Sequence, residues 1–343
     1  MIAQTAPPDV RPSPKSKRRL DDNTARNLGL VGVLVLLVVI GIVTKPELYS
    51  DPTWVRNNVL TILQQASAIG VVTVGMTFVI IGGGIELSVG AIIALAGVWA
   101  TTLATQSHGA GGMIFTALIV GVAVGLINGV LISYGRLVPF IATLAMLVSA
   151  RGLAAQISGK QTQVSANDTI NGIATTKLLG VPLLVWILAV VVAAGWVLLN
   201  RTTFGRRTVA VGGNPEAARL AGINVKRHTV LLYALSGLCC GLAAIMLTSQ
   251  ATSAQAAMAN LYELDAIAAA IIGGTLLSGG RGTIIGALFG VLVFSTITNL
   301  FAINNLSTEV QNMVKGGIIV AAVLIQQFRY KSFTHLLGRK PAS

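Results

Sequence analysis

Few residues in this sequence are of types that carry chemistry. The 343-residue chain holds eleven acidic residues, three histidines and two cysteines. Cys239 and Cys240 are adjacent within an apolar run, which excludes a disulfide framework and indicates packing residues. His108, His228 and His335 are scattered without a metal-ligand partner at helical spacing, which is typical of solvated side chains. We therefore expect no metal site and no catalytic centre.

The chain also offers little for energy coupling. It contains no GxxxxGK[ST] segment, so it has no P-loop of its own for ATP. Among the acids, Glu86 alone lies in a tight connection between two apolar runs, where an ionisable group is expensive and usually functional. We expect Glu263, Asp265 and Glu309 at helix starts that water reaches. Energy for any transport is therefore expected from outside the polypeptide.

The elements that must hold these residues are membrane helices. Hydrophobic residues make up 54% of the chain and charged residues 10%, against the roughly 25% charged residues of a soluble domain. A helix needs ~20 apolar residues to cross a bilayer. The pattern predicts an all-α polytopic membrane protein with about ten transmembrane helices, although nine or eleven crossings stay open because some runs are short or carry glycine. The runs are approximately 28–44, 59–81, 89–105, 113–134, 139–156, 182–199, 229–249, 264–278, 283–303 and 309–328.

The basic residues predict an orientation. Lys and Arg gather in cytoplasmic loops near membrane segments. With ten crossings and the N-terminus inside, the inside segments hold 18 basic residues and the outside segments hold four, namely Lys45, Arg56, Lys160 and Lys177. Both termini are therefore predicted to be cytoplasmic, and the net charge of +13 indicates topology rather than a nucleic-acid partner.

Three parts follow from this reading. Residues 1–27 carry Pro, Ser and basic residues without an apolar stretch, which predicts a disordered basic cytoplasmic tail. Residues 28–328 form the membrane domain, and its largest cytoplasmic loop is 200–228. Residues 329–343 form a cytoplasmic C-terminal tail. The first run lacks a small-residue cleavage pattern, so we expect it to remain as an anchor.

That loop contains GGNPEAARLAG, Gly212 to Gly222, which predicts a short helix. Asn214 is a good N-cap, Pro215 suits the first helical position, and Glu216 complements the helix dipole. Gly222 supplies a left-handed stop. A helix of about two turns is marginal in water, so it needs a partner surface. A second protein, the membrane interface and the rest of the chain stay open as that surface.

Five segments of the chain, one of which lies in this loop, resemble segments of a known protein family. From about Asn57 to Gln327 the chain resembles permease subunits of bacterial ATP-binding cassette importers for ribose, xylose, arabinose and galactose. Each segment alone is weak, but all five occur in the family's order. They are GMTFVIIGGGIELSVGAIIALAG (Gly75 to Gly97), VPFIATLAML (Val138 to Leu147), ARGLA (Ala150 to Ala154), TTFGRRTVAVGGNPEAARLAGINV (Thr202 to Val225) and GGTLLSGGRGTIIGALFG (Gly273 to Gly290).

The resemblance implies a multi-pass protein of the bacterial inner membrane that translocates a sugar or related polyol. It implies an ATPase subunit that binds ATP, a periplasmic sugar-binding protein, and a second permease copy in a homodimer or heterodimer. The permease itself would need no cofactor. The resemblance also implies that 200–228 carries a coupling helix that docks on the ATPase. The residues expected there are Gly213, Asn214, Pro215, Glu216, Ala217, Ala218, Arg219 and Gly222, with Ile223 matching as well.

Two glycine-rich segments are expected along the substrate pathway. GGGIELSVG resembles the family's GGIDLSVG, except that Glu86 stands where Asp is usual, which leaves the transfer of an Asp contact open. Glu86 either binds sugar hydroxyls or accepts hydrogen bonds from the next helix start. IIGGG at Ile80 and IIGGT at Ile271 share an opening, which hints at a parallel internal repeat. The predicted pathway residues are Gly83, Gly84, Glu86, Ser88, Asn128, Thr275 and Ser278.

Other polar residues in apolar runs are given structural roles. Arg151 and Lys315 lie near predicted helix ends, where long cations snorkel to head groups, and we favour this interpretation over a substrate role. Asn128, Asn299 and Gln311 are expected to join helices by hydrogen bonds, and a place along the sugar path stays open for each of them.

Two outside segments, 45–58 and 157–181, are polar enough to dock the binding protein. Two other function classes stay open at this point. An ion-coupled secondary sugar carrier would transport without an ATPase, and a channel or scaffold would never exceed equilibration. The transported sugar does not follow from these residues.

Overall fold

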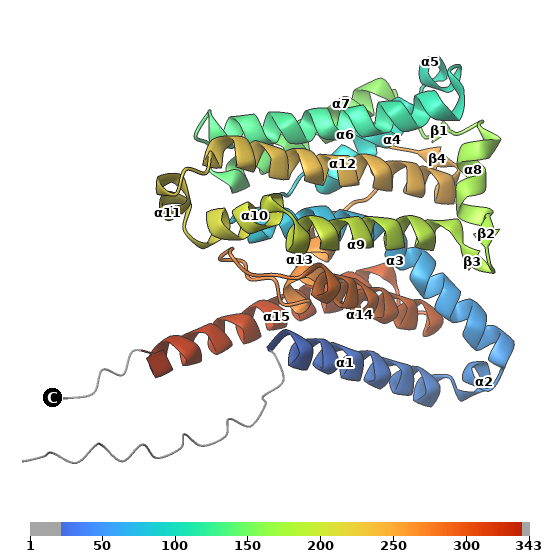
Figure 1. Cartoon of the computed structure of the whole chain (residues 1–343). Helices are drawn as coiled ribbons and strands as arrows, with labels where there is room; N and C mark the ends of the chain where they lie inside the picture. The colour runs from blue at the N-terminus through green and yellow to red at the C-terminus, as the bar shows by residue number, and fades with distance from the viewer. Residues whose placement is uncertain (1–21, 338–343) are drawn as a thin grey trace, which may run out of the picture.

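The computed structural model describes residues 22–337, and most of them are helical (Figure 1). Residues 1–21 and 338–343, parts of the two predicted tails, lie outside the described residues. The helices in chain order are α1 (Asp22–Thr44), α2 (Pro46–Tyr49), α3 (Pro52–Ile81), α4 (Val89–Ala100), α5 (Leu103–Gln106), α6 (Gly109–Ser133), α7 (Pro139–Ile157), α8 (Asp168–Thr175), α9 (Leu183–Arg201), α10 (Thr203–Gly213), α11 (Pro215–Leu220), α12 (Val225–Ala251), α13 (Tyr262–Ile272), α14 (Ile284–Ile303) and α15 (Thr308–Leu337).

Each of the ten predicted apolar runs overlaps a helix, but not all of these helices can cross a bilayer. Within residues 22–337, seven are long and apolar enough, namely α1 from Arg26, α3, α6, α7, α9, α12 and α14. With 12 and 11 residues, α4 and α13 cover only about 18 Å at 1.5 Å per residue. Both are short because a glycine segment breaks the run on one side. The fold is thus a polytopic helical bundle, and ten full crossings are not established.

Short strands modify the all-α prediction. β1 (Gln163–Val164) pairs antiparallel with β4 (Ser253–Ala254), and β2 (Lys177–Leu178) pairs with β3 (Val181–Pro182) in a hairpin. All four are two residues long and lie between apolar runs or, for β3, at the start of the run 182–199. The β1–β4 pair joins the segment after α7 to the segment after α12, because backbone groups outside helices still need partners.

The core is built around α4 and the second half of α3. Every residue of α4 except Trp99 is buried, and α3 is buried continuously from Gly70 to Ile81. α12 packs against α6 along a row of glycines, where a Cβ on Gly121 would overlap the carbonyl oxygen of Gly237. Small residues at such a contact let two membrane helices approach closely. In contrast, α1 has most of its apolar side chains exposed, as a lipid-facing helix does.

Helices extend into both predicted tails, and the division of the chain into three parts stays a prediction. α1 begins at Asp22, so residues 22–27 are helical, and α15 continues through residues 329–337. Arg26, which we assigned to the basic tail, donates from Nη1 to the carbonyl oxygen of Gly274 at 3.4 Å and from Nη2 to Oγ1 of Thr283 at 3.3 Å. This long-range contact anchors the start of α1 and extends the helix beyond its apolar run.

Candidate coupling site and glycine junction

The loop 200–228 folds into two helices, α10 and α11, with Asn214 between them. The side chain of Asn214 accepts a hydrogen bond from the backbone N–H of Ala217 at 3.0 Å, and Pro215 occupies the first helical position. Gly222 has φ +82°, and Ile223 donates its N–H to the carbonyl oxygen of Ala218 at 3.0 Å. The predicted start at Asn214 and stop at Gly222 are confirmed. The sequence reading missed α10, although Thr202 marks its N-cap.

An ion pair joins two side chains on the exposed face of α11. Arg219 donates from Nη2 to Glu216 Oε1 at 2.5 Å and from Nε to Oε2 at 3.1 Å, and both side chains are about two-thirds exposed. The hydrogen bond and charge of Arg219 hold the pKa of Glu216 below its usual value. Because the pair is exposed, its free-energy contribution is small, but the fork geometry fixes both side chains on one face.

α11 makes little contact with the rest of the chain. Ala218 is its one buried residue, and Leu220 is 75% exposed. In Figure 1, α11 lies at one end of the bundle, and α2, α8 and the β2–β3 hairpin lie at the opposite end. Packing on its own protein therefore accounts for one side chain of the helix only. A capped helix with an exposed leucine is suited to docking on another surface.

In contrast, α10 is firmly attached to the bundle. Thr208, 0% exposed, is hydrogen-bonded through Oγ1 to Nε2 of His228 in α12 at 2.9 Å. The ring of Phe204 lies 4.7 Å from the His228 ring and 6.0 Å from the ring of Phe78 in α3. The prediction of a solvated His228 is wrong, because α10 covers the imidazole. α10 thus forms a rigid link between α11 and the membrane helices.

The last turn of α10 meets both glycine segments at a contact that we name the glycine junction, formed by Gly83, Gly212, Gly279 and Gly280. Gly280 donates its N–H to the carbonyl oxygen of Ile81 at 2.8 Å. A Cβ on Gly212 would overlap that same oxygen, and one on Gly279 would lie 2.7 Å from the Gly212 oxygen. The junction therefore admits backbone only. Gly212 was not predicted as a site residue, although the GG pair before Asn214 is a signal for it.

The predicted likeness of the two glycine segments extends to their hydrogen bonds. After α3, the N–H groups of Gly82, Gly83 and Gly84 reach back to Phe78, Ile80 and Val79. After α13, the N–H groups of Gly273, Gly274 and Thr275 reach back to Ala269, Ile271 and Ala270, which is the same pattern. Gly83 and its counterpart Gly274 have φ +82° and +86°. Both helices thus end in the same left-handed cap, which only glycine adopts without strain.

Three of the predicted pathway residues form one buried cluster. Glu86 accepts hydrogen bonds through Oε1 from the N–H of Ser88 at 2.7 Å and its hydroxyl at 2.5 Å, and through Oε2 from Asn128 Nδ2 at 2.8 Å. All three side chains are 0% exposed. This geometry favours the structural reading of Glu86, in which its carboxylate holds the start of α4 against α6. A role on the sugar pathway stays a prediction.

The remaining pathway residues are placed apart. Gly83 belongs to the glycine junction, and Gly84 packs against the ring of Tyr233. Thr275 is fully buried, whereas Ser278 is exposed at the tip of the second segment. The structure therefore does not gather the seven predicted residues around one cavity.

Several predicted roles of polar residues need correction. Arg151 does not snorkel, because its Nη1 donates to the carbonyl oxygens of Ala256 at 2.6 Å and Met258 at 3.2 Å. Lys315 does not snorkel either, because its Nζ donates to Asp265 Oδ2 at 3.1 Å. Glu263 is buried, at 8% exposure, rather than open to water.

The three amides predicted to join helices behave differently. Asn128 joins α6 to the α3–α4 connection, as predicted. Gln311 bonds instead within its own segment, to the carbonyl oxygen of Leu306 at 2.9 Å. Asn299 is buried on α14, and its Oδ1 has no partner among the described residues.

Residues 58–323 match the family described as branched-chain amino acid transport system / permease component. The chain is 40% identical over 318 residues to the ribose import permease protein RbsC of Bacillus subtilis (strain 168), covering 91% of this chain and 96% of that protein. It is 34% identical over 327 residues to the L-arabinose ABC transporter permease protein AraH of Azospirillum brasilense, covering 95% of each. It is 32% identical over 319 residues to the galactose/methyl galactoside import permease protein MglC of Escherichia coli (strain K12), covering 87% of this chain and 93% of that protein.

No solved structure matches the chain. The resemblance to sugar importer permeases that the five segments predict is confirmed by these relatives, which cover most of the chain. The exposed, capped α11 and the glycine junction behind it, both within the matched residues, are thus features of a transport protein. The chain belongs to the branched-chain amino acid transport system / permease component family of multi-pass membrane proteins.

Proposed function

We propose that the chain is the permease subunit of an ATP-driven importer that moves a sugar or related polyol across a bacterial inner membrane. The observation that carries this proposal is α11, a helix capped at both ends that turns nearly all its side chains away from its own protein. ATP binds to a separate ATPase subunit on which α11 docks. A second permease copy, identical or homologous, completes the membrane part. The relatives named for ribose, arabinose and galactose import support a monosaccharide cargo.

The basic residues support an orientation with α11 in the cytoplasm. Arg206, Arg207 and Arg227 are exposed around α10 and α11, where they can meet acidic protein or lipid head groups. The opposite end of the bundle then faces the periplasm and receives the sugar-binding protein. The predicted docking segment 157–181 lies at that end, and its Lys160 and Lys177 are exposed.

Movement of the ATPase would reach the membrane helices through α10. Because Asn214 joins α11 directly to α10, a displacement of one helix moves the other. α10 in turn packs the backbone of Gly212 against the last residue of α3 and the segment that follows α13, at the glycine junction. Contacts made by backbone alone have no flexible side chain to absorb a displacement. In this way ATP hydrolysis in the partner would change how the two glycine segments pack together. The positions of α3 and α13, which end at these segments, would change with them.

Copurification with the ATPase subunit tests this proposal. The chain and the ATPase are co-expressed, solubilised in detergent and captured through a tag on the permease. We expect Leu220→Asp, and the double change Glu216→Ala and Arg219→Ala, to lower the recovered ATPase severalfold. Leu179→Asp is the matched control, because Leu179 is 85% exposed in the β2–β3 turn at the opposite end. Equal recovery from wild type and Leu220→Asp would contradict docking through α11.

The ion-coupled carrier is distinguished in membrane vesicles. Uptake by the importer requires ATP on the side of the membrane that carries the ATPase, and it persists when a protonophore is added. Uptake by the carrier requires no ATP and stops when a protonophore is added. Glu86 itself is not placed as a proton relay, because a relay needs an acid that solvent can reach and its carboxylate is 0% exposed.

A further inference from the structure

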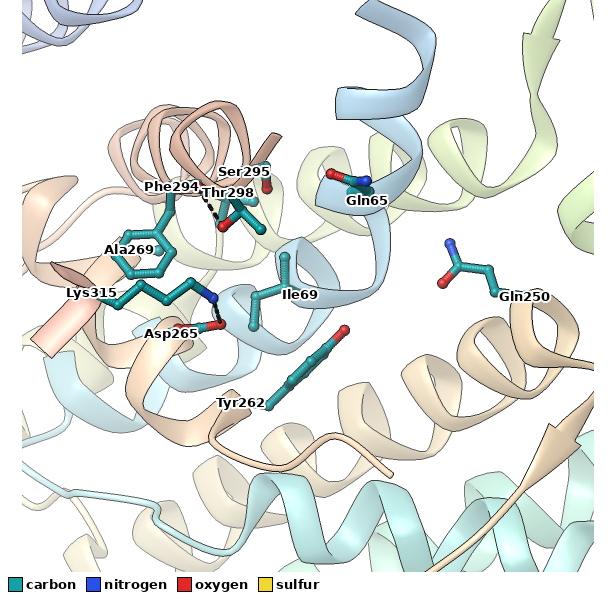
Figure 2. A pocket seen from close by; sticks show the side chains of 11 residues that line it. Gln65, Ile69, Gln250, Tyr262, Asp265, Ala269, Phe294, Ser295, Thr298 and Lys315 are labelled. Atoms are coloured by element: carbon teal, nitrogen blue, oxygen red, sulfur yellow. Dashed lines mark hydrogen bonds and ion pairs between the residues drawn. The ribbon is translucent and has the colours of Figure 1, made fainter. Parts of the chain in front are cut away.

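A cavity of about 240 Å³ lies between α3, α12, α13, α14 and α15 (Figure 2). A second cavity of about 260 Å³ adjoins it, and Gln250 and Tyr262 line both. Each volume is several times the ~30 Å³ that one water molecule occupies. The first cavity, lined by both polar and apolar side chains, has room for a solute as large as a sugar ring.

One wall of the first cavity holds an ion pair. Lys315 Nζ lies 3.1 Å from Asp265 Oδ2, and each side chain is 18% exposed. Lys315 Nζ also lies 5.4 Å from the centre of the Phe294 ring, which borders the same space. Charged groups at membrane depth are expensive and mark solute paths more often than lipid contacts. Within residues 22–337, Lys315 is the one hydrogen-bond partner of the Asp265 carboxylate, which leaves acceptor positions for a solute.

Other residues that line the first cavity carry polar groups without protein partners. Among the described residues, the Gln65 amide, the Tyr262 hydroxyl and the Ser295 hydroxyl make no side-chain hydrogen bond. Figure 2 shows the Tyr262 hydroxyl directed into the space between Gln65 and Gln250. Polar groups beside such a space are satisfied by water or by a solute that both donates and accepts hydrogen bonds. The Tyr262 and Phe294 rings offer apolar faces for C–H groups.

We propose that this cavity is a monosaccharide subsite on the translocation route, in which the Asp265–Lys315 pair and Gln65 bind sugar hydroxyls. The inference rests on the proposed function for its class of solute. A sugar is the solute that matches these walls, because its hydroxyls both donate and accept while its ring carbons are apolar. The cavity also lies toward the end of the bundle opposite α11, since Gln250 is near the last residue of α12 and Tyr262 is the first of α13. In the proposed orientation, both residues face the periplasmic side.

Protection of an introduced cysteine from alkylation tests the subsite directly. Gln65→Cys is made in the full chain, purified in detergent and treated with a maleimide. Background is low because native Cys239 and Cys240 are buried. We expect ribose, arabinose or galactose in the millimolar range to slow labelling of Gln65→Cys severalfold. Sucrose at the same concentration controls for osmolarity. Gln156→Cys on α7, an exposed glutamine that lines neither cavity, should label at one rate throughout.

The role of the ion pair is tested in the same background. We expect Asp265→Asn to abolish sugar protection while the cysteine still labels. Exchange of the pair, Asp265→Lys with Lys315→Asp, separates a structural tether from a binding role. A tether alone predicts that the exchanged pair restores protection, whereas the subsite predicts that it does not.

No protection by any of the three sugars, or equal protection of Gln156→Cys, overturns the subsite. Size-exclusion profiles identify a variant that fails to fold. Cysteine labelling needs no ATPase, so its result does not depend on whether α11 docks on the ATPase. A chain that shows sugar protection but recovers no ATPase would contradict the importer and keep the subsite. Recovery of the ATPase without sugar protection would overturn the subsite and keep the importer.

Discussion

Gly280 donates its backbone N–H to the carbonyl oxygen of Ile81 at 2.8 Å, although 199 positions separate the two residues in the chain. This bond joins the end of α3 to the segment that follows α13, and Gly212 of α10 packs against the same oxygen. α13 therefore has the glycine junction after its last residue and the cavity residues Tyr262 and Asp265 in its first turn. One short helix connects the region beneath α11 with the proposed sugar subsite.

The first prediction concerns Gly212. We expect Gly212→Ala to destabilise the protein by ~1–3 kcal/mol, because the new methyl group overlaps the Ile81 carbonyl oxygen and backbone cannot move aside. The apparent melting temperature in detergent measures the change. Gly213→Ala is the matched control, because a Cβ there meets nothing within 4 Å. Equal melting temperatures for the two variants would contradict a closed junction.

The cap of α11 gives a second prediction. Asn214→Ala removes the acceptor for the Ala217 N–H, and an N-cap contributes ~0.5–2 kcal/mol to its helix. We expect weaker recovery of the ATPase subunit in the copurification assay, because a frayed α11 presents its face less often. Asn214→Asp keeps the acceptor and should restore recovery. Equally weak recovery of the ATPase with Asn214→Asp and with Asn214→Ala would show that the capping hydrogen bond does not determine ATPase binding.

A third prediction follows from the buried imidazole. Thr208→Val leaves His228 Nε2 without its described partner, which costs ~1–3 kcal/mol in a buried setting. We expect α10 to loosen and trypsin to cut faster at Arg206 and Arg207, as a cleavage time course on gels would show. Thr203→Val provides the comparison, because Thr203 is exposed on the same helix. Unchanged cleavage in Thr208→Val would show that other contacts hold α10.

The Glu86 cluster gives a fourth prediction. Glu86→Ala leaves hydrogen-bond donors of Ser88 and Asn128 without an acceptor, so we expect a lower melting temperature. Because both residues share one hydrogen-bond network, the effects of Glu86→Ala and Asn128→Ala should be less than additive. Glu47→Ala, at an exposed glutamate of α2, should leave the melting temperature unchanged. Strict additivity would argue that the two side chains act independently.

The parts of this protein that could be predicted from its sequence are those written in neighbouring residues. The apolar runs mark the helices, because a span long enough to cross a bilayer has to be apolar along its own length. The caps of α11 were also predictable, since Asn214 bonds Ala217 three residues ahead and Gly222 needs only its own φ. The shared opening of the two glycine segments was likewise visible in the sequence, and the structure adds that both end in the same cap.

Contacts between distant residues were decided by the tertiary structure. Nothing near His228 reveals that Thr208 and Phe204 cover it, and nothing near Lys315 reveals Asp265, fifty positions away. Burial of Glu263 and the meeting of Gly83, Gly212 and Gly280 depend likewise on how helices pack. A side chain's hydropathy states its preference for water, but its partner is set by which helix faces it, and that follows only from the packing of the whole bundle.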